Sequence, residues 1–354
     1  MSRLVQALAI ASSTLALVAA LEGGLRVLTS QNSKWNVRLG AAKQFDPITR
    51  FRNRPHYAFA NGVVTNERGY LAPDLLGPEL PTDRLRLVYL GDSVTFLPIG
   101  ANYPQRLEEI LENERGIPVE TVNTAVPGFA SDSVRALFES EVSRLDAHYL
   151  FVYVGWNDLG QYGPEGLPYK RQTAGYEISP LQRLLTGSYS VRLFYALQDV
   201  VRRWQPTLDE PLEDRERELY ERYVPAHFEE NLRSMLQLAK ARYPNVLVMN
   251  LATLTSDGPT PDELQRMHFP VGMSKNVRKL DRLVRSYNEV VEAVARTEGV
   301  PRIDLHAVFS GHEAKRHLTD SCHVDPEGAA LIARTALAAI EPSLPASLAR
   351  LEAH

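Results

Sequence analysis

The sequence has only one cysteine, Cys322, in 354 residues. A single cysteine excludes an internal disulfide and any Cys-x-x-Cys metal or redox site, although it does not identify a cellular compartment. The chain also lacks a P-loop, a Gly-x-Gly-x-x-Gly motif and internal repeats. Sequence motifs therefore indicate no cofactor.

An excess of positive charge is absent as well. The formal net charge is −4, whereas proteins that bind nucleic acid usually carry a basic face. Arg50, Arg52 and Arg54 form one local basic cluster, but three charges on a loop are typically solvated. We therefore expect no nucleic-acid partner.

The histidines do not form a recognised metal motif. His312 and His317 lie at the ends of a segment that resembles a zinc-binding His-Glu-x-x-His helix, but they are one residue too far apart to share a helix face. We interpret them, together with His306, as surface or core residues. The sequence consequently predicts no metal site.

The segment from Leu85 to Phe96 has the sequence LRLVYLGDSVTF. Its apolar run stops at Gly-Asp-Ser, which predicts a buried parallel strand that presents Ser93 at the carboxyl edge of a sheet, where open α/β folds bind ligands. Gly-Asp-Ser is also common in ordinary turns. The partners of Ser93 therefore decide whether it is a nucleophile.

Strand and helix patterns alternate after this segment. Such alternation predicts a parallel sheet with right-handed crossovers and helices on both faces. We expect further strands at 119–126, 149–154, 246–251 and 302–308, and helices at 102–115, from Ser131 or Asp132 onward, and at 277–294.

Polar residues follow the predicted strands. Gly128 comes after the second strand, Asn157 comes after the third, and the pair Asp320 and His323 precedes the last predicted helix. Because the carboxyl ends of parallel strands meet at one edge of a sheet, these residues could converge with Ser93 on a single site.

This set resembles the SGNH, or GDSL-type, hydrolase family, whose four short blocks supply a Ser, a Gly, an Asn and a His. The resemblance implies a three-layer α/β/α fold with a five-stranded parallel sheet in flavodoxin-like order. It also implies that Ser93 is the nucleophile, His323 the base and Asp320 the carboxylate that orients the base. The oxyanion hole would consist of the backbone N–H groups of Ser93 and Gly128 and the side chain of Asn157.

The residue types suit this chemistry. A serine is a weak nucleophile unless a base removes its proton, and a histidine, with an ordinary pKa of about 6.5, can take that proton and return it to a leaving alcohol. Asp320 lies three residues before His323 and could bind its other ring nitrogen. The same segment could instead serve as a helix cap, with Asp325 at the N-cap and Pro326 at N1, and both interpretations can hold together.

Three neighbours of the proposed site are expected to have structural roles. Asp92 and Asp158 should fix their loops through bonds to the backbone. We interpret Cys322 as a small loop residue rather than a nucleophile, because the side chains of adjacent residues tend to point apart.

Residues 1–30 contain an apolar stretch, Leu4 to Leu21, with no charge between Arg3 and Glu22. This pattern favours a membrane-spanning signal anchor or a signal peptide over a buried or amphipathic helix. We therefore expect a membrane-anchored or exported protein of the cell envelope, with its catalytic domain outside the cytoplasm.

Three further regions follow. Residues 31–84 should form an irregular lead-in, because prolines interrupt it, and its aromatic residues favour packing on the domain. Residues 85–345 should form the hydrolase domain. Within it, residues 160–230 interrupt the alternation of strands and helices, and they could form either a lid over the site or a helical flap over the edge of the sheet.

The sequence thus predicts an esterase that hydrolyses a carboxylic O-acyl ester through an acyl-Ser93 intermediate. The substrates of the resembled family include acetylated sugars, lipids and small acyl esters. Two alternatives remain open: transfer of the acyl group to a sugar hydroxyl, and glycan binding without catalysis. Motifs cannot separate hydrolysis from transfer, because both begin with the same acyl-enzyme.

Overall fold

The computed structural model describes most of the chain. The described residues are 3–30, 42–59, 62–74, 77–96, 102–161, 164, 188–191, 193–194, 197, 206–256, 258–270 and 273–345. Residues 31–41 of the predicted lead-in lie outside them. So do 165–187 and some shorter parts of the predicted insertion at 160–230, and the choice between a lid and a flap falls on those residues.

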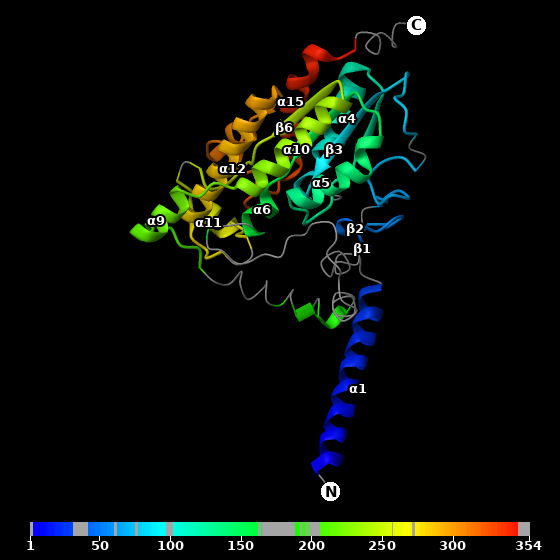
Figure 1. Cartoon of the computed structure of the whole chain (residues 1–354), viewed down its shortest axis with the longest axis vertical. Helices are drawn as coiled ribbons and strands as arrows, with labels where there is room; N and C mark the ends of the chain where they lie inside the picture. The colour runs from blue at the N-terminus through cyan, green and yellow to red at the C-terminus, as the bar shows by residue number, and fades with distance from the viewer. Residues whose placement is uncertain are drawn as a thin grey trace.

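A five-stranded parallel sheet forms the centre of the protein (Figure 1). Its strands are β3 (Leu85–Gly91), β4 (Val119–Asn123), β5 (Tyr149–Tyr153), β6 (Asn245–Met249) and β7 (Arg302–Ile303). The order across the sheet is β4-β3-β5-β6-β7, with parallel pairing throughout. This confirms the predicted flavodoxin-like order.

Helices cover both faces of this sheet, which completes the predicted three layers (Figure 1). Helices α4 (Tyr103–Arg115) and α15 (Pro326–Ile340) pack against each other on one face, and α5 (Ser131–Ser140), α10 (Ala226–Arg242) and α12 (Val277–Glu298) pack on the other. Every residue of β3 and β5 is buried, as expected for strands covered on both faces.

Short helices complete the description. They are α3 (Ser93–Phe96), α6 (Trp156–Gln161), α9 (Asp214–Glu221), α11 (Pro261–Arg266), α13 (Leu305–Val308) and α14 (His312–Lys315), with single 3-10 turns at Val142–Arg144 and Glu341–Ser343.

Two local predictions were wrong. The last strand ends at Ile303 rather than at 308, because the Asp304 side chain accepts a hydrogen bond from the Ala307 N–H and starts α13. Helix α5 has Ala130 as its N-cap and no side-chain cap. Ser131 and Asp132 lie within its first turn instead, where their side chains bind other helices.

The described part of the lead-in contains an antiparallel hairpin that the sequence did not predict. Its strands are β1 (Lys43–Asp46) and β2 (Arg50–Asn53). The hairpin packs on the loop after β4: Asn53 donates to the Ala125 carbonyl at 3.0 Å, and the rings of Phe51 and Phe129 lie 5.2 Å apart. The expected packing of the lead-in on the domain is thus observed for these residues.

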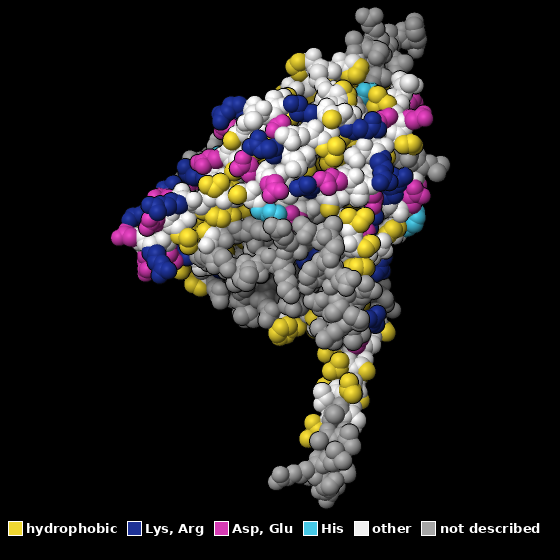
Figure 2. All heavy atoms as spheres, viewed as in Figure 1, with side chains coloured by type: hydrophobic (Ala, Val, Ile, Leu, Met, Phe, Trp, Pro, Cys, Tyr) yellow, Lys and Arg dark blue, Asp and Glu magenta, His cyan; other side chains and the backbone are white. Residues whose placement is uncertain are grey.

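The basic cluster in this hairpin is not simply solvated. Arg52 donates to both carboxylate oxygens of Glu141, at 2.7 and 2.9 Å. The interpretation of Arg52 as a solvated charge was therefore wrong. Elsewhere, positive and negative side chains are interspersed over the visible face of the protein, in keeping with the small net charge (Figure 2).

Helix α1 (Arg3–Ser30) extends away from the body of the protein (Figure 1). Near its C-terminal end, the Glu22 carboxylate accepts hydrogen bonds from the N–H groups of Tyr189 and Ser190, at 2.9 and 3.0 Å. Among the described residues, no helix combines the length and the hydropathy that spanning a bilayer requires. The structure does not support the expected membrane-spanning helix.

Candidate active site

Ser93 lies where β3 ends and the short helix α3 begins. The turn is tight: a Cβ at Gly91 would lie 2.6 Å from the Tyr153 carbonyl oxygen, so only glycine fits there. The Asp92 carboxylate accepts a hydrogen bond from the Val94 N–H at 3.0 Å, which fixes the start of α3. Strand, glycine and cap together place the Ser93 hydroxyl at the carboxyl end of β3, the second strand across the sheet.

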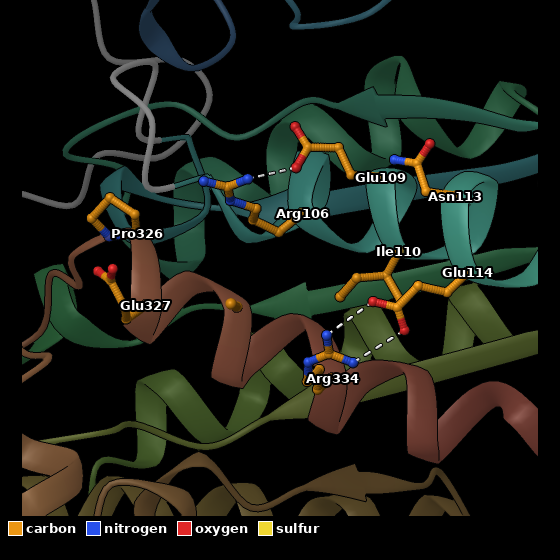
Figure 3. Close-up of a pocket in the computed structure, with 9 residues that line it drawn as sticks. Arg106, Glu109, Ile110, Asn113, Glu114, Pro326, Glu327 and Arg334 are labelled. Atoms are coloured by element: carbon orange, nitrogen blue, oxygen red, sulfur yellow. Dashed lines mark hydrogen bonds and ion pairs between the residues drawn. The ribbon is translucent and has the colours of Figure 1, made fainter.

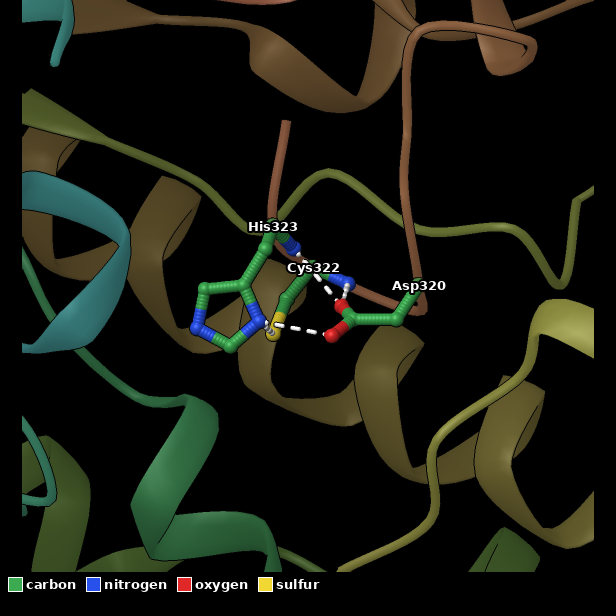
Figure 4. A group of neighbouring side chains, drawn as sticks. All are labelled: Asp320, Cys322 and His323. Atoms are coloured by element: carbon green, nitrogen blue, oxygen red, sulfur yellow. Dashed lines mark hydrogen bonds and ion pairs between the residues drawn. The ribbon is translucent and has the colours of Figure 1, made fainter. Parts of the chain in front are cut away.

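The structure brings Ser93, His323 and Asp320 together. His323 Nε2 lies 2.9 Å from Ser93 Oγ, and His323 Nδ1 lies 2.8 Å from Asp320 Oδ2. Figure 4 shows the carboxylate of Asp320 facing the ring of His323. In the arrangement that satisfies both contacts, Nδ1–H donates to Asp320 and Nε2 accepts from the Ser93 hydroxyl. A proton can therefore pass from Ser93 to His323.

The turn itself holds Asp320. Its other oxygen, Oδ1, accepts the backbone N–H groups of Cys322 at 2.9 Å and His323 at 2.8 Å. Burial alone would raise the pKa of Asp320, but the hydrogen bond and charge of His323 and these backbone bonds lower it to about 2. The carboxylate therefore stays ionised at neutral pH.

The pKa of His323 is raised. Burial on its own lowers this pKa, but the hydrogen bond and the charge of Asp320, together with the charge of Asp92, outweigh burial and favour the imidazolium. His323 is consequently a stronger base than an isolated histidine, which suits removal of a hydroxyl proton.

Two backbone N–H groups are open for an oxyanion. Within the described residues, the N–H groups of Ser93 and Gly128 make no hydrogen bond. Gly128 lies in the loop between β4 and α5 with φ 88°, a left-handed conformation that glycine adopts without strain. These two amides could therefore act as the donors that the sequence predicts.

The side-chain amide of Asn157 is not free to donate, because it already binds two acceptors in the protein. It lies in the first turn of α6, and its Nδ2 group donates to Asp92 Oδ2 and to the Phe129 carbonyl, each at 3.0 Å. Both amide hydrogens are thus engaged in this state. To bind an oxyanion, Asn157 must exchange one of these acceptors for it.

Asp92 and Asp158 bind the backbone as predicted, at the N–H groups of Val94 and Ser131 respectively. Both also bind side chains, which the sequence did not predict: Asn157 donates to Asp92, and the Ser131 hydroxyl donates to Asp158. Burial raises the pKa of Asp92 to about 6 and that of Asp158 to about 7, although their hydrogen bonds act in the opposite direction.

Sequence reasoning missed a polar network next to Asp158. Asn231 donates to the Ser131 hydroxyl at 3.0 Å and to Asp132 at 2.7 Å, and His227 Nε2 lies 2.6 Å from the same Asp132 carboxylate. These contacts join α10 to α5 and, through Ser131, to α6. The signal in the sequence was the spacing of His227 and Asn231, two polar residues one helical turn apart.

Cys322 contacts the base directly. Its Sγ lies 3.6 Å from His323 Nδ1, so the expectation that the two adjacent side chains point apart was wrong (Figure 4). The thiol is buried, and burial raises its pKa well above the ordinary value. Cys322 therefore remains a neutral thiol and is a poor nucleophile.

Two clusters among the described residues have side chains that metals can use as ligands. In the first, Asp320, Cys322 and His323, the ring nitrogens of the histidine already contact Asp320 and Ser93, and the thiol is protonated, so the cluster fits proton transfer better than metal binding.

The second cluster consists of His317, Asp325 and Glu327. Here Asp325 is occupied as the N-cap of α15: it accepts the Gly328 N–H at 2.7 Å and contacts His317 Nδ1 at 3.1 Å. Pro326 occupies the first turn of the helix. The predicted cap is confirmed, and this cluster fits a structural turn.

A surface hollow of about 370 Å³ lies between α4 and α15 (Figure 3). Charged pairs line it, Arg106 with Glu109 and Arg334 with Glu114, and no member of the Ser93 cluster does. The hollow is therefore separate from the candidate active site.

The chain is similar in sequence to one protein family and in structure to several solved proteins. A sequence model of the GDSL-like lipase/acylhydrolase family matches residues 89–331. Similar solved structures include Axe2, an acetylxylan esterase from Geobacillus stearothermophilus, at 16% identity and a TM-score of 0.44, covering 73% of this chain and 96% of that one. A GDSL-like lipase from Bacteroides thetaiotaomicron is similar at 15% identity and a TM-score of 0.44, covering 76% and 93%. None of the curated proteins matches the chain significantly.

Proposed function

We propose that this chain, which belongs to the GDSL-like lipase/acylhydrolase family and is an ester-hydrolysing enzyme, acts through an acyl-Ser93 intermediate. The observation that carries the proposal is the continuous contact from Ser93 Oγ through His323 to Asp320, with distances of 2.9 and 2.8 Å. This is the arrangement in which a serine hydroxyl is activated by a base whose orientation a carboxylate fixes.

In the first half-reaction, His323 Nε2 takes the proton of Ser93 while Oγ attacks the carbonyl carbon of the ester. The carbonyl oxygen becomes an oxyanion, which the Ser93 and Gly128 N–H groups bind. The intermediate then collapses: the ester C–O bond breaks, His323 gives its proton to the leaving alcohol, and the acyl group stays on Ser93.

In the second half-reaction, His323 takes a proton from water, and the resulting hydroxyl attacks the acyl carbon. The same N–H groups bind the second oxyanion. Collapse of this intermediate releases the carboxylic acid and returns the proton to Ser93. Asp320 keeps the ring of His323 in one orientation and stabilises its positive charge in both halves.

For the substrate we infer an O-acyl ester of an envelope glycan or lipid. The apolar segment from Leu4 to Leu21 supports export to the envelope, as a signal sequence would. Short acyl chains would point to a sugar ester, and long chains to a lipid.

The test is hydrolysis of a panel of acyl esters of increasing chain length by the full-length protein and its Ser93→Ala variant. We expect kcat/KM of the variant to fall by roughly three orders of magnitude or more, as for other serine hydrolases that lose their nucleophile. Ser286→Ala is the matched control, because the Ser286 hydroxyl lies on α12 and, among the described residues, bonds only the Arg282 carbonyl of the same helix.

The intermediate can be observed directly. Mass spectrometry of protein quenched during turnover of a slow ester should show one acyl group on the peptide that contains Ser93. Activity that survives in Ser93→Ala would refute the mechanism. Formation of an acylated sugar instead of free acid, with both activities lost in the variant, would keep the acyl-Ser93 step and replace hydrolysis by transfer.

A further inference from the structure

Lys43 reaches from the N-terminal hairpin to the loop that carries Gly128. It is the first residue of β1, and its Nζ group donates a hydrogen bond to the Pro127 carbonyl oxygen at 2.5 Å. The same ammonium lies 3.2 Å from the position that a Cβ on Gly128 would occupy. A cation is thus in contact with the proposed oxyanion loop.

Among the described residues, the contacts of this ammonium are apolar or neutral. Nζ lies 4.4 Å from the centre of the Phe51 ring, and the residue opposite Lys43 on β2 is Asn53. Among the described residues no carboxylate forms an ion pair with Lys43. Burial lowers the pKa of Lys43 to about 8, so the group is still mostly charged at neutral pH.

The hydrogen bond from Lys43 can affect the Gly128 N–H because its acceptor is the Pro127 carbonyl. The Pro127 carbonyl and the Gly128 N–H belong to one planar, conjugated peptide unit. A charged donor at the carbonyl oxygen draws electron density from the nitrogen and makes its N–H a stronger donor, because hydrogen bonds in series polarise one another. The Gly128 N–H itself makes no hydrogen bond within the described residues, so it is available to the oxyanion.

We propose that Lys43 is a positioning residue for the reaction: its ammonium orients and polarises the Pro127–Gly128 peptide so that the Gly128 N–H binds the oxyanion more strongly. The proposal rests on the proposed function, because it assigns Lys43 to the oxyanion loop of that reaction. It also gives the hairpin before the hydrolase domain a role in catalysis.

A purely mechanical role for Lys43 is already filled by its neighbours. Asn53 holds the loop through the Ala125 carbonyl, and Phe51 packs against Phe129. Among the described residues, Lys43 is the one that adds a positive charge at the Pro127 carbonyl oxygen. The variant that isolates this charge is Lys43→Met, since methionine retains most of the side-chain length and can pack on Phe51.

The experiment compares the full-length protein with Lys43→Met, Lys43→Arg and Asn53→Ala. We expect Lys43→Met to lower kcat about tenfold, a part of the roughly 10²–10³-fold effect of a whole oxyanion donor, with little change in KM. Lys43→Arg, which keeps the charge, should retain most of kcat. Asn53→Ala should lower the melting temperature and leave kcat nearly unchanged.

A second readout is the affinity for phenylboronic acid, which forms a tetrahedral anion on a reactive serine. This affinity should fall in parallel with kcat in Lys43→Met but not in Asn53→Ala. Lys240→Met is the matched control, because Lys240 also donates to a backbone carbonyl, that of Glu298, at an exposed site. It should change neither kcat nor boronate affinity.

The outcomes separate this inference from the proposed function. If Lys43→Met keeps kcat and boronate affinity within twofold of the parent while Ser93→Ala is inactive, the role of Lys43 is refuted and the acyl-Ser93 mechanism stands. A rise in KM alone also refutes it, since that indicates ground-state binding. If Lys43→Met does not fold, equal losses of kcat and boronate affinity in Lys43→Arg and Asn53→Ala overturn the proposal. Activity in Ser93→Ala refutes the proposed function itself.

Discussion

Asn157 donates its side-chain amide to Asp92, with 3.0 Å between Nδ2 and Oδ2. A carboxylate can only accept hydrogen bonds, so Asp92 dictates which end of the Asn157 amide faces it. The residue that precedes the nucleophile thereby orients a residue that the family resemblance places in the oxyanion hole. Asp92 is ionised for this purpose above its pKa of about 6.

We predict that Asp92→Asn disturbs catalysis through Asn157. The new side chain can still accept the Val94 N–H, but it turns an NH₂ group toward the Asn157 amide, and two donors repel. The value of kcat/KM should fall about 10–100-fold, within the range for loss of one oxyanion donor.

The matching measurement is a double-mutant cycle with Asn157→Ala. Because Asp92 acts through Asn157, the double variant should be little worse than the worse single variant. Fully additive losses would show that Asp92 acts independently. Asp262→Asn, at an exposed position that binds Arg266, controls for the loss of one negative charge.

The order of the sheet was predictable because the pattern that marks each strand lies within a few consecutive residues. Each central strand is a short apolar run bounded by polar residues, and strands that alternate with helices leave few topologies to choose from. The end of β7 was not predictable in this way. Residues 302–308 remain apolar enough for a strand, and only the cap formed by Asp304 makes Leu305–Val308 the helix α13.

The residues of the site were likewise predictable only where the sequence signal is local. Asp320 and His323 were found because three residues separate them, and one turn can hold both. Lys43 was not found, because its contact with Pro127 spans 84 residues and depends on a hairpin. The turn signal of that hairpin is Asp46-Pro47, which marks a turn but, unlike Asn-Gly, does not mark a hairpin. The hydrogen bond from Asn157 to Asp92 could not be predicted either, because sequence spacing does not show which way a side-chain amide points.

The pH dependence of the reaction should report His323. The base must be neutral to accept a proton, so kcat/KM should fall on the acid side as His323 becomes protonated. Because Asp320 and Asp92 raise the pKa of His323, this limb should lie above pH 6.5, the ordinary value.

The substitution Asp320→Asn removes the main cause of that shift. Burial, which lowers the pKa of His323, then dominates, so the limb should move to lower pH while the maximum rate falls by up to about 10⁴-fold. Profiles of kcat/KM against pH for the parent, Asp320→Asn and Asp92→Asn test this. A limb that stays in place or moves to higher pH in Asp320→Asn would contradict the assigned role of Asp320.

The last prediction concerns Gly128, which has a left-handed backbone conformation and also carries one of the proposed oxyanion donors. Its φ of 88° is unfavourable for residues with a side chain, and an added Cβ would come within 3.2 Å of Lys43 Nζ. Gly128→Ala must therefore relax the loop or displace the ammonium. Either change moves the N–H that we assign to the oxyanion, and kcat should fall about 10²-fold or more.

Gly299→Ala is the control that separates strain from catalysis. Gly299 ends α12 with φ 64°, and a Cβ there would meet nothing within 4 Å. Both substitutions should cost about 1–2 kcal/mol of unfolding free energy, because both force alanine into the left-handed region. Only Gly128→Ala should lose kcat. If the two variants lose stability equally and both keep kcat, the Gly128 N–H does not bind the oxyanion, and the donors must be sought at Ser93 and at an Asn157 released from Asp92.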